Sequence, residues 1–221
     1  MLPLQIGEIA LACKGEAHGE AQVTSVCIDS RKISQGCLFI AIKGDRFDGH
    51  DFVEKAFEEG AAAVMVHRDI HCRGPYVRVA NTREALLRLA GYYRQFFQIP
   101  VVGLTGSVGK TTTKEMTAAV LSKRYKTLKN EGNLNNEIGM PMTAFGLDLS
   151  YGAAVFEMGM SGFGEIARMA RAAAPTVGII TNIGVSHMEQ LGSRENIRKA
   201  KLELLDANSK WGRCAARRRA N

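Results

Sequence analysis

The 221-residue sequence contains no apolar run near the ~20 residues that cross a bilayer, and its N-terminus lacks the basic and apolar regions of a secretory signal. Its five cysteines are scattered and never form a C-x-x-C pair. These absences argue against a membrane span, a disulfide framework and a zinc site. We therefore expect a cytoplasmic protein with reduced thiols, and 46% hydrophobic residues are enough to form a buried core.

Acidic residues are missing from residues 208–221, which hold five basic ones. This segment supplies +5 of the formal net charge of +7, so residues 1–207 carry only +2. A nearly neutral body offers no basic surface for nucleic acid, and we expect no nucleic-acid partner. The segment has no amphipathic period either, which indicates a basic tail, such as a shifted reading frame would produce.

A glycine-rich segment, Gly103–Lys114, follows an apolar strand-like run and opens a helical one. Strand, loop and helix in this order are typical of nucleoside triphosphate sites, where N–H groups at a helix N-terminus point at phosphate. The usual first glycine falls on Leu104, so this is a tighter T-G-x-x-G-K-T-T-T variant. Lys110 would add a positive charge and the Thr111 hydroxyl would coordinate Mg²⁺. The residues expected to contact ATP are Thr105, Gly106, Ser107, Val108, Gly109, Lys110, Thr111 and Thr112.

Strand-like and helix-like segments alternate along the chain, which predicts an α/β fold with a mostly parallel sheet. We expect a small N-terminal α/β domain over 1–98, then an incomplete P-loop ATPase domain over 99–207. In such sheets ligands bind at the carboxyl ends of the strands. The expected strands are 24–28, 37–42, 62–66, 76–79, 99–104, one near Thr127, 153–157 and 177–181, and the expected helices are 51–59, 81–97, 110–124, 162–173 and 193–207.

Two polar residues stand where apolar strands end. Glu157 closes the run Ala153–Glu157, and His187 lies in the loop after 177–181. Both are therefore expected at the carboxyl edge of the sheet, beside the glycine-rich loop. An acid at this place is typical of the residue that holds Mg²⁺ with the loop threonine, although a lone acid after a strand is often only a loop residue.

A lysine in the last expected helix lies on its apolar face. Ile197, Lys201 and Leu204 stand at positions i, i+4 and i+7, whereas Arg198 is turned away. Burial would lower the pKa of Lys201 and leave more neutral amine to react with CO₂ and form a carbamate. The alternative is a stem packed on the core with its ammonium group reaching water.

Three further blocks follow the glycine-rich loop: 132–141 (GNLNNEIGMP), 157–165 (EMGMSGFGE) and 181–192 (TNIGVSHMEQLG). Together with the TGSVGKTTT loop they resemble the Mur ligases, from about Val23 to about Leu205. The NNEIG and EMGM blocks favour the branch that adds a dipeptide over the sister that adds the third peptide residue. In this family a further part of the ATPase domain and a C-terminal domain follow, and 208–221 does not resemble them, so we expect a truncated chain that is inactive alone.

The resemblance implies an ATP-dependent ligase of peptidoglycan precursor synthesis, a monomer that joins D-alanyl-D-alanine to UDP-MurNAc-tripeptide through an acyl phosphate. It implies that Glu157 and His187 are magnesium ligands and that Lys201 is the carbamoylated lysine beside a second Mg²⁺. The other implied substrate contacts, which are open to a simpler interpretation as turn formers and surface charges, are Asn135, Asn136, Ser30, Arg31 and Lys32.

Two other classes compete with this interpretation. A generic P-loop kinase or NTPase would leave the Asn-rich block and the His187 block unexplained. A non-catalytic binding module using the Arg-rich tail would show salt-sensitive retention on nucleic acid.

Overall fold

The computed structural model describes residues 1–206 and 213–216. The chain forms two compact units, Met1–Tyr92 and Tyr93–Asn221. The division falls inside the helix Thr82–Arg94, before the boundary expected near residue 98. The last residues of this helix pack with the second unit. There the Tyr93 ring lies 5.2 Å from Phe97 and 5.8 Å from Phe145 between ring centroids, and its hydroxyl donates a hydrogen bond to the Leu147 carbonyl at 2.6 Å.

The first unit combines short strands with three α-helices and one turn of 3₁₀-helix. Asn81 begins the last of these helices as expected, because its Oδ1 accepts hydrogen bonds from the N–H groups of Arg83 and Glu84. In chain order the elements are β1 (Leu4–Gln5), α1 (Ile6–Cys13), β2 (Glu16–His18), β3 (Gln22–Val23), β4 (Ser25–Cys27), β5 (Cys37–Ile40), η1 (Gly49–Phe52), α2 (Val53–Glu58), β6 (Ala63–Val66), β7 (Tyr76–Arg78) and α3 (Thr82–Arg94).

The sheet of the first unit has the order β2-β7-β6-β5-β4, and only β2 runs antiparallel to its neighbour. Strands β5 and β6 are buried at every position because both are continuous apolar runs, as central parallel strands usually are. Strands β1 and β3 form a separate antiparallel pair. Cys27 and Cys37 are buried free thiols and pack as small apolar side chains.

The second unit alternates strands and helices in the manner expected of an α/β domain. Its strands β8 and β10 are buried at every residue, and β10 spans the same residues as the predicted strand 153–157. In chain order its elements are β8 (Val101–Thr105), α4 (Lys110–Leu121), β9 (Thr127–Lys129), α5 (Gly139–Ala144), β10 (Ala153–Glu157), α6 (Glu165–Ala173), β11 (Val177–Ile180), α7 (Met188–Leu191), α8 (Arg194–Asp206) and β12 (Arg213–Ala216).

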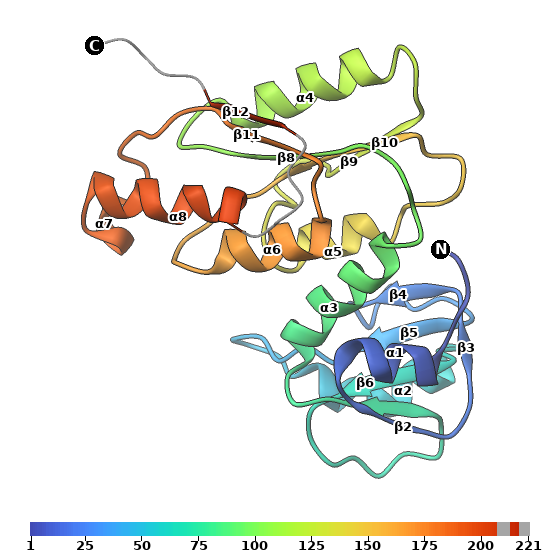
Figure 1. Ribbon diagram of the computed structural model, residues 1–221. Coiled ribbons are helices and arrows are strands. Elements are labelled where there is room, and N and C mark those ends of the chain that lie inside the picture. Colours follow the sequence, from blue (N-terminus) through green and yellow to red (C-terminus); the bar gives the residue numbers. More distant parts are fainter. Residues whose placement is uncertain (207–212, 217–221) are drawn as a thin grey trace. The chain divides into compact units, whose positions relative to one another are not determined.

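All five strands of this sheet are parallel, in the order β9-β10-β8-β11-β12. Helix α4 covers one face of the sheet, and α5, α6 and α8 cover the other (Figure 1). Strand β8 has β10 on one side and β11 on the other, so the direction of winding changes at β8. In open α/β sheets the carboxyl edge at such a point is where ligands bind. The fold class predicted from the sequence, an α/β fold with a parallel sheet, is confirmed.

Several elements were not visible in the sequence pattern. Helix α5 contains a glycine and a proline, and β12 lies in the segment that was expected to be an irregular tail. Helix α6 begins at Glu165 and not at 162, because Gly164 has a φ of 83°. The carboxylate of Glu203 accepts hydrogen bonds there from the N–H groups of Gly164 and Ala167.

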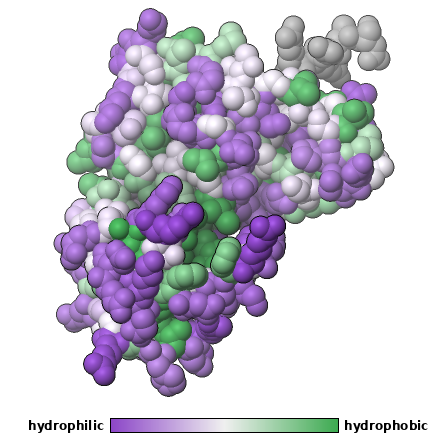
Figure 2. Space-filling model, turned by 180° about the vertical axis from the view of Figure 1, so that it is seen from behind, coloured by the Kyte–Doolittle hydropathy of each residue, from purple (hydrophilic) through white to green (hydrophobic). Residues whose placement is uncertain are grey.

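No helix among the described residues is long and apolar enough to cross a membrane. Hydrophilic residues cover much of the face shown in Figure 2.

Candidate functional site

The glycine-rich loop joins the carboxyl end of β8 to the first turn of α4. Gly106 comes close to the strand beside it, because a Cβ atom built on it would lie 1.8 Å from the Thr181 Oγ1. Gly109 is the N-cap of α4 and has a φ of 78°, which side chains other than glycine rarely adopt. Both glycines have a positive φ, 156° at Gly106 and 78° at Gly109, and Gly106 is in addition restricted by its close approach to Thr181.

The loop after β11 holds the glycine-rich loop in its conformation. Asn182 Oδ1 accepts hydrogen bonds from the N–H groups of Ser107 and Val108, both at 3.1 Å. The Thr181 hydroxyl donates to the Val108 carbonyl at 2.7 Å, and Lys110 Nζ donates to the Gly106 carbonyl at 3.0 Å. The loops after β8 and β11 therefore form one hydrogen-bonded structure at the carboxyl edge of the sheet.

Replacement of Gly106 by alanine is expected to lower the free energy of unfolding by about 2 kcal/mol or more, since the methyl group must displace Thr181 and break its bond to Val108. Gly109→Ala meets no atom within 4 Å and should cost only about 1–2 kcal/mol of backbone strain. Urea denaturation of both variants measures the difference. Equal losses at the two positions would contradict the close-approach argument.

A buried carboxylate, that of Glu157, lies at the carboxyl end of β10. Its Oε2 accepts a hydrogen bond from the Thr111 hydroxyl at 3.1 Å, and its Oε1 accepts one from Asn135 Nδ2 at 2.8 Å. Asn130 fixes the backbone at the same residue, because its Oδ1 accepts from the Glu157 N–H at 2.9 Å and its Nδ2 donates to the Glu157 carbonyl at 3.0 Å. Thr111, Asn135 and Glu157, which the sequence singled out separately, are thus brought together.

Lys201 lies on the buried face of α8 with Ile197 and Leu204, as the helix periodicity predicted, and is 1% exposed. Burial, aided by the positive charge of Lys110, lowers the pKa of Lys201 to about 8. Its Nζ has no hydrogen-bond or ion-pair partner among residues 1–206 and 213–216. A buried amine without a counter-ion is the environment in which a lysine becomes reactive.

His187 is the N-cap of α7 and adopts a left-handed φ of 69°. Burial lowers the pKa of His187, and the charges of Lys201 and Lys110 lower it further against the opposing effect of Glu165. The imidazole is therefore kept neutral near pH 7, the form that binds a metal ion. Because Lys201 and Lys110 both lower the pKa of His187, the three side chains lie near enough for their charges to interact.

The remaining candidate residues of the second unit differ in how far they are exposed to solvent. The Thr105 hydroxyl is buried and donates to the Met158 carbonyl at 2.8 Å, whereas Thr112 and Val108 are exposed. Asn136 acts as a cap for α5, because its Oδ1 accepts hydrogen bonds from the N–H groups of Ile138 and Gly139.

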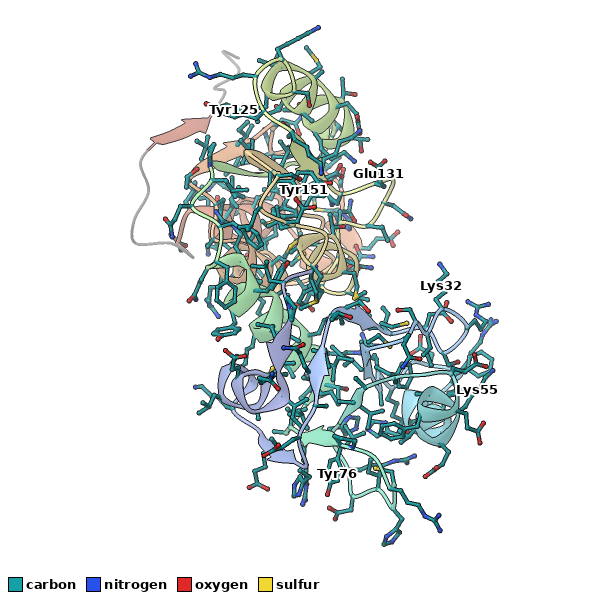
Figure 3. The ribbon with its side chains drawn as sticks, turned by 90° about the vertical axis from the view of Figure 1, so that its right-hand side faces the viewer. Lys32, Lys55, Tyr76, Tyr125, Glu131 and Tyr151 are labelled. Carbon is teal, nitrogen blue, oxygen red and sulfur yellow. The ribbon has the colours of Figure 1, made fainter. Side chains whose placement is uncertain are left out.

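Ser30, Arg31 and Lys32 lie in the turn between β4 and β5 of the first unit. The Arg31 guanidinium forms two hydrogen bonds with the Asp29 carboxylate and holds the pKa of Asp29 well below its usual range. Lys32 is exposed and extends into solvent (Figure 3). Of the two cations, only Lys32 is without a carboxylate partner among the described residues.

Sequence reasoning missed two residues of the site in the second unit. Asn130 directly follows β9, at the same sheet edge as Glu157. A polar residue at the end of a strand could have indicated from the sequence that Asn130 belongs to the site. Lys114 is buried one helical turn beyond Lys110, and its spacing of four residues from the buried Ala118 on α4 was the corresponding signal.

The oxygen donors of Thr111 and Glu157 suit a magnesium ion, which takes hard oxygen ligands and often only one or two from the protein beside substrate phosphates and water. No group of three or more His, Cys, Asp or Glu side chains within the described residues has the arrangement of a complete metal cage. The two oxygen donors therefore fit a magnesium ion that takes further ligands from water or from a bound phosphate.

Both units match known families of domains. Residues 104–216 match the family described as the Mur ligase middle domain, and residues 22–94 match the one described as Mur ligase family, catalytic domain. The first match includes part of the segment 208–221 that the sequence pattern set apart as a tail.

The chain is 45% identical over 213 residues to a UDP-N-acetylmuramoyl-tripeptide--D-alanyl-D-alanine ligase of Bacillus subtilis (strain 168), covering 93% of this chain and 47% of that protein. It is 42% identical to the protein of the same name in Escherichia coli (strain K12), covering 92% and 45%. The chain thus spans about half the length of the curated relatives it matches.

Solved structures agree with the sequence matches. A crystal structure of MurF from Acinetobacter baumannii has a TM-score of 0.91 at 36% identity and covers 97% of this chain and 48% of that one. MurF ligase from Thermotoga maritima in complex with ADP has a TM-score of 0.83 at 33% identity and covers 88% and 45%.

Proposed function

This chain belongs to the Mur ligase family, and we propose that it supplies the substrate-binding and ATP-binding parts of a ligase that joins D-alanyl-D-alanine to UDP-MurNAc-tripeptide. The observation that carries this proposal is the hydrogen bond from the Thr111 hydroxyl to the buried carboxylate of Glu157, 3.1 Å long, beside the glycine-rich loop. It lies at the carboxyl edge of the parallel sheet, where the direction of winding changes. Relatives of the same name and MurF structures support the choice of substrates. We assign residues 1–98 to the UDP-sugar peptide and 99–207 to ATP.

The proposed reaction begins at the loop between β8 and α4. The ammonium group of Lys110 and the N–H groups at the start of α4 neutralise charge on the β- and γ-phosphates of ATP. A magnesium ion held by Thr111 and Glu157 would add positive charge to the same oxygens. The terminal carboxylate of the tripeptide attacks the γ-phosphorus, the bond to ADP breaks, and an acyl phosphate forms.

The second step forms the amide. The amine of D-alanyl-D-alanine attacks the acyl carbon, phosphate leaves with the electrons of the broken C–O bond, and the proton that the amine loses passes to the departing phosphate. We place His187 and the carbamate of Lys201 beside the carboxylate and the transferred phosphate, where they would bind a second magnesium ion. Support comes from the lowered pKa of His187 and from the buried amine of Lys201, which has no hydrogen-bond or ion-pair partner among the described residues.

The first unit would hold the UDP-MurNAc part of the substrate. Lys32 has no carboxylate partner among the described residues and would meet the diphosphate there, with Ser30 as a hydroxyl donor, while Arg31 is held by Asp29. In the second unit Asn135 would lie next to the reacting phosphate through its bond to Glu157, and Asn136 would keep the neighbouring helix in place. We further propose a cytoplasmic monomer, since its substrates are small molecules of the cytoplasm.

Binding measured by calorimetry tests the proposal on the chain itself. Wild-type chain should bind MgADP and, independently, UDP-MurNAc-tripeptide, and Lys32→Ala should weaken only the second. Binding of MgADP without any binding of the UDP-sugar would favour a generic P-loop NTPase. Absence of both would overturn the proposed function.

A further inference from the structure

Lys114 carries a buried positive charge that the proposed mechanism does not use. Its side chain is 0% exposed, and its Nζ lies 3.7 Å from Glu157 Oε2 and 3.5 Å from Glu115 Oε1. The same Nζ donates a hydrogen bond to the Gly132 carbonyl at 3.4 Å. One ammonium group therefore contacts α4, the end of β10 and the loop that follows β9.

The two carboxylates near Lys114 are not equivalent. The Glu115 side chain is 47% exposed and also forms an ion pair with Lys129, so water and a second cation weaken its hold on Lys114. The Glu157 side chain is 2% exposed and its charge is screened much less. Glu131, in the same loop as Gly132, points outward and offers Lys114 no competing acid (Figure 3). Glu157 is therefore the main electrostatic partner of Lys114.

Packing alone does not account for a lysine at this position. The side chain faces the sheet from α4, and Ala118, one turn further along, is buried on the same face. Methionine would fill such a position without the cost of removing an ammonium group from water. The charge of Lys114 is therefore what the site requires.

We propose that Lys114 is a positioning residue for the magnesium-binding carboxylate, an inference that rests on the proposed function. Lys114 holds the 130–136 loop at Gly132 and attracts Glu157 at Oε2, while Asn135 of that loop donates to Oε1. The contacts close a ring through α4, β10 and the loop. Within the ring the carboxylate of Glu157 stays turned toward the Thr111 hydroxyl, ready for a divalent cation.

The variant Lys114→Met tests this role, because methionine keeps the volume of the side chain and removes its charge. ADP binding is measured by calorimetry in EDTA and then across a MgCl₂ titration. We expect the Mg²⁺ concentration needed for half of the metal-dependent gain in ADP affinity to rise about tenfold or more, the usual effect of removing a residue that orients a metal ligand. ADP affinity in EDTA should change less than about threefold, because Lys110 and the glycine-rich loop are untouched.

Lys126→Met is the matched control, since Lys126 is an exposed lysine of the same unit that is bonded to Ser150. It should leave both affinities unchanged. Lys114→Gln keeps a donor for the Gly132 carbonyl without the charge, and it serves if the methionine variant fails to fold. An unchanged Mg²⁺ requirement in the folded variant, or an equal loss of affinity with and without Mg²⁺, would overturn the positioning role.

Hydrogen exchange of the nucleotide-free protein separates this inference from the proposed function. Lys114→Met should speed exchange at the amides of residues 131–136 and leave those of α6 unchanged. If wild type binds no nucleotide but the variant loosens this loop, the proposed function fails while the ring of contacts stands. If the loop is unaffected in the variant, the inference fails even if MgADP binds.

Discussion

Lys110→Ala is expected to lower ATP-dependent ligation about a thousandfold or more in a ligation-competent form of this protein. The lysine follows Gly109 at the first position of α4, and its Nζ already lies at the loop, 3.0 Å from the Gly106 carbonyl. Among the described residues, no other lysine or arginine side chain forms a hydrogen bond with the glycine-rich loop. Charge that develops on the transferred phosphate would lose its main cationic partner.

The measurement is kcat/KM for phosphate release with both substrates and Mg²⁺ present. Lys123→Ala removes an exposed lysine near the other end of α4 and should change the rate less than about twofold. If Lys110→Ala stays within tenfold of wild type, the assignment of the phosphate site to this loop is wrong.

Lys201→Ala should be similarly damaging, and small carboxylates should restore part of the activity. With a pKa of about 8, about a tenth of the amine is neutral at pH 7, against roughly one part in three thousand for an ordinary lysine. Burial thus makes carbamate formation with CO₂ far easier at this residue. Alanine leaves a cavity in which formate or acetate can take the place of the missing carboxylate.

The test compares turnover of Lys201→Ala with and without added formate or acetate, using chloride to match ionic strength. Arg198→Ala is the control on the same helix, because Arg198 is exposed and forms an ion pair with Glu195. A failure of both carboxylates to raise turnover, together with an inactive Lys201→Glu, would remove the support for a carbamate.

The sequence predicted those parts of the fold that depend on local pattern. Strand β10 is a continuous apolar run, and α4 follows two glycines whose spacing marks a phosphate loop, so both could be located within a few residues. Lys201 could be placed on a buried face because helical periodicity fixes which residues share a side. These predictions needed no knowledge of distant contacts.

The parts that were missed depend on residues far apart in the chain. Helix α5 contains Gly139 and Pro141, which local propensity disfavours, and tertiary packing buries it all the same. Strand β12 exists because β11 offers it a free edge to pair with, and nothing in its own residues indicates a strand. Lys114 looks like an ordinary helix lysine until Glu157 and Gly132 are brought beside it.

The bond from Asn182 to the N–H groups of Ser107 and Val108 has a consequence for how fast and how tightly a polyphosphate binds. A phosphate oxygen that accepts hydrogen bonds from those two N–H groups must first displace the side-chain oxygen of Asn182. Association is therefore an exchange of hydrogen-bond acceptors and does not require a flexible loop to become ordered. The conformational entropy of the loop is then already lost when the protein folds. The affinity for nucleotide reflects the difference in hydrogen-bond strength between the neutral Asn182 oxygen and the anionic phosphate oxygen.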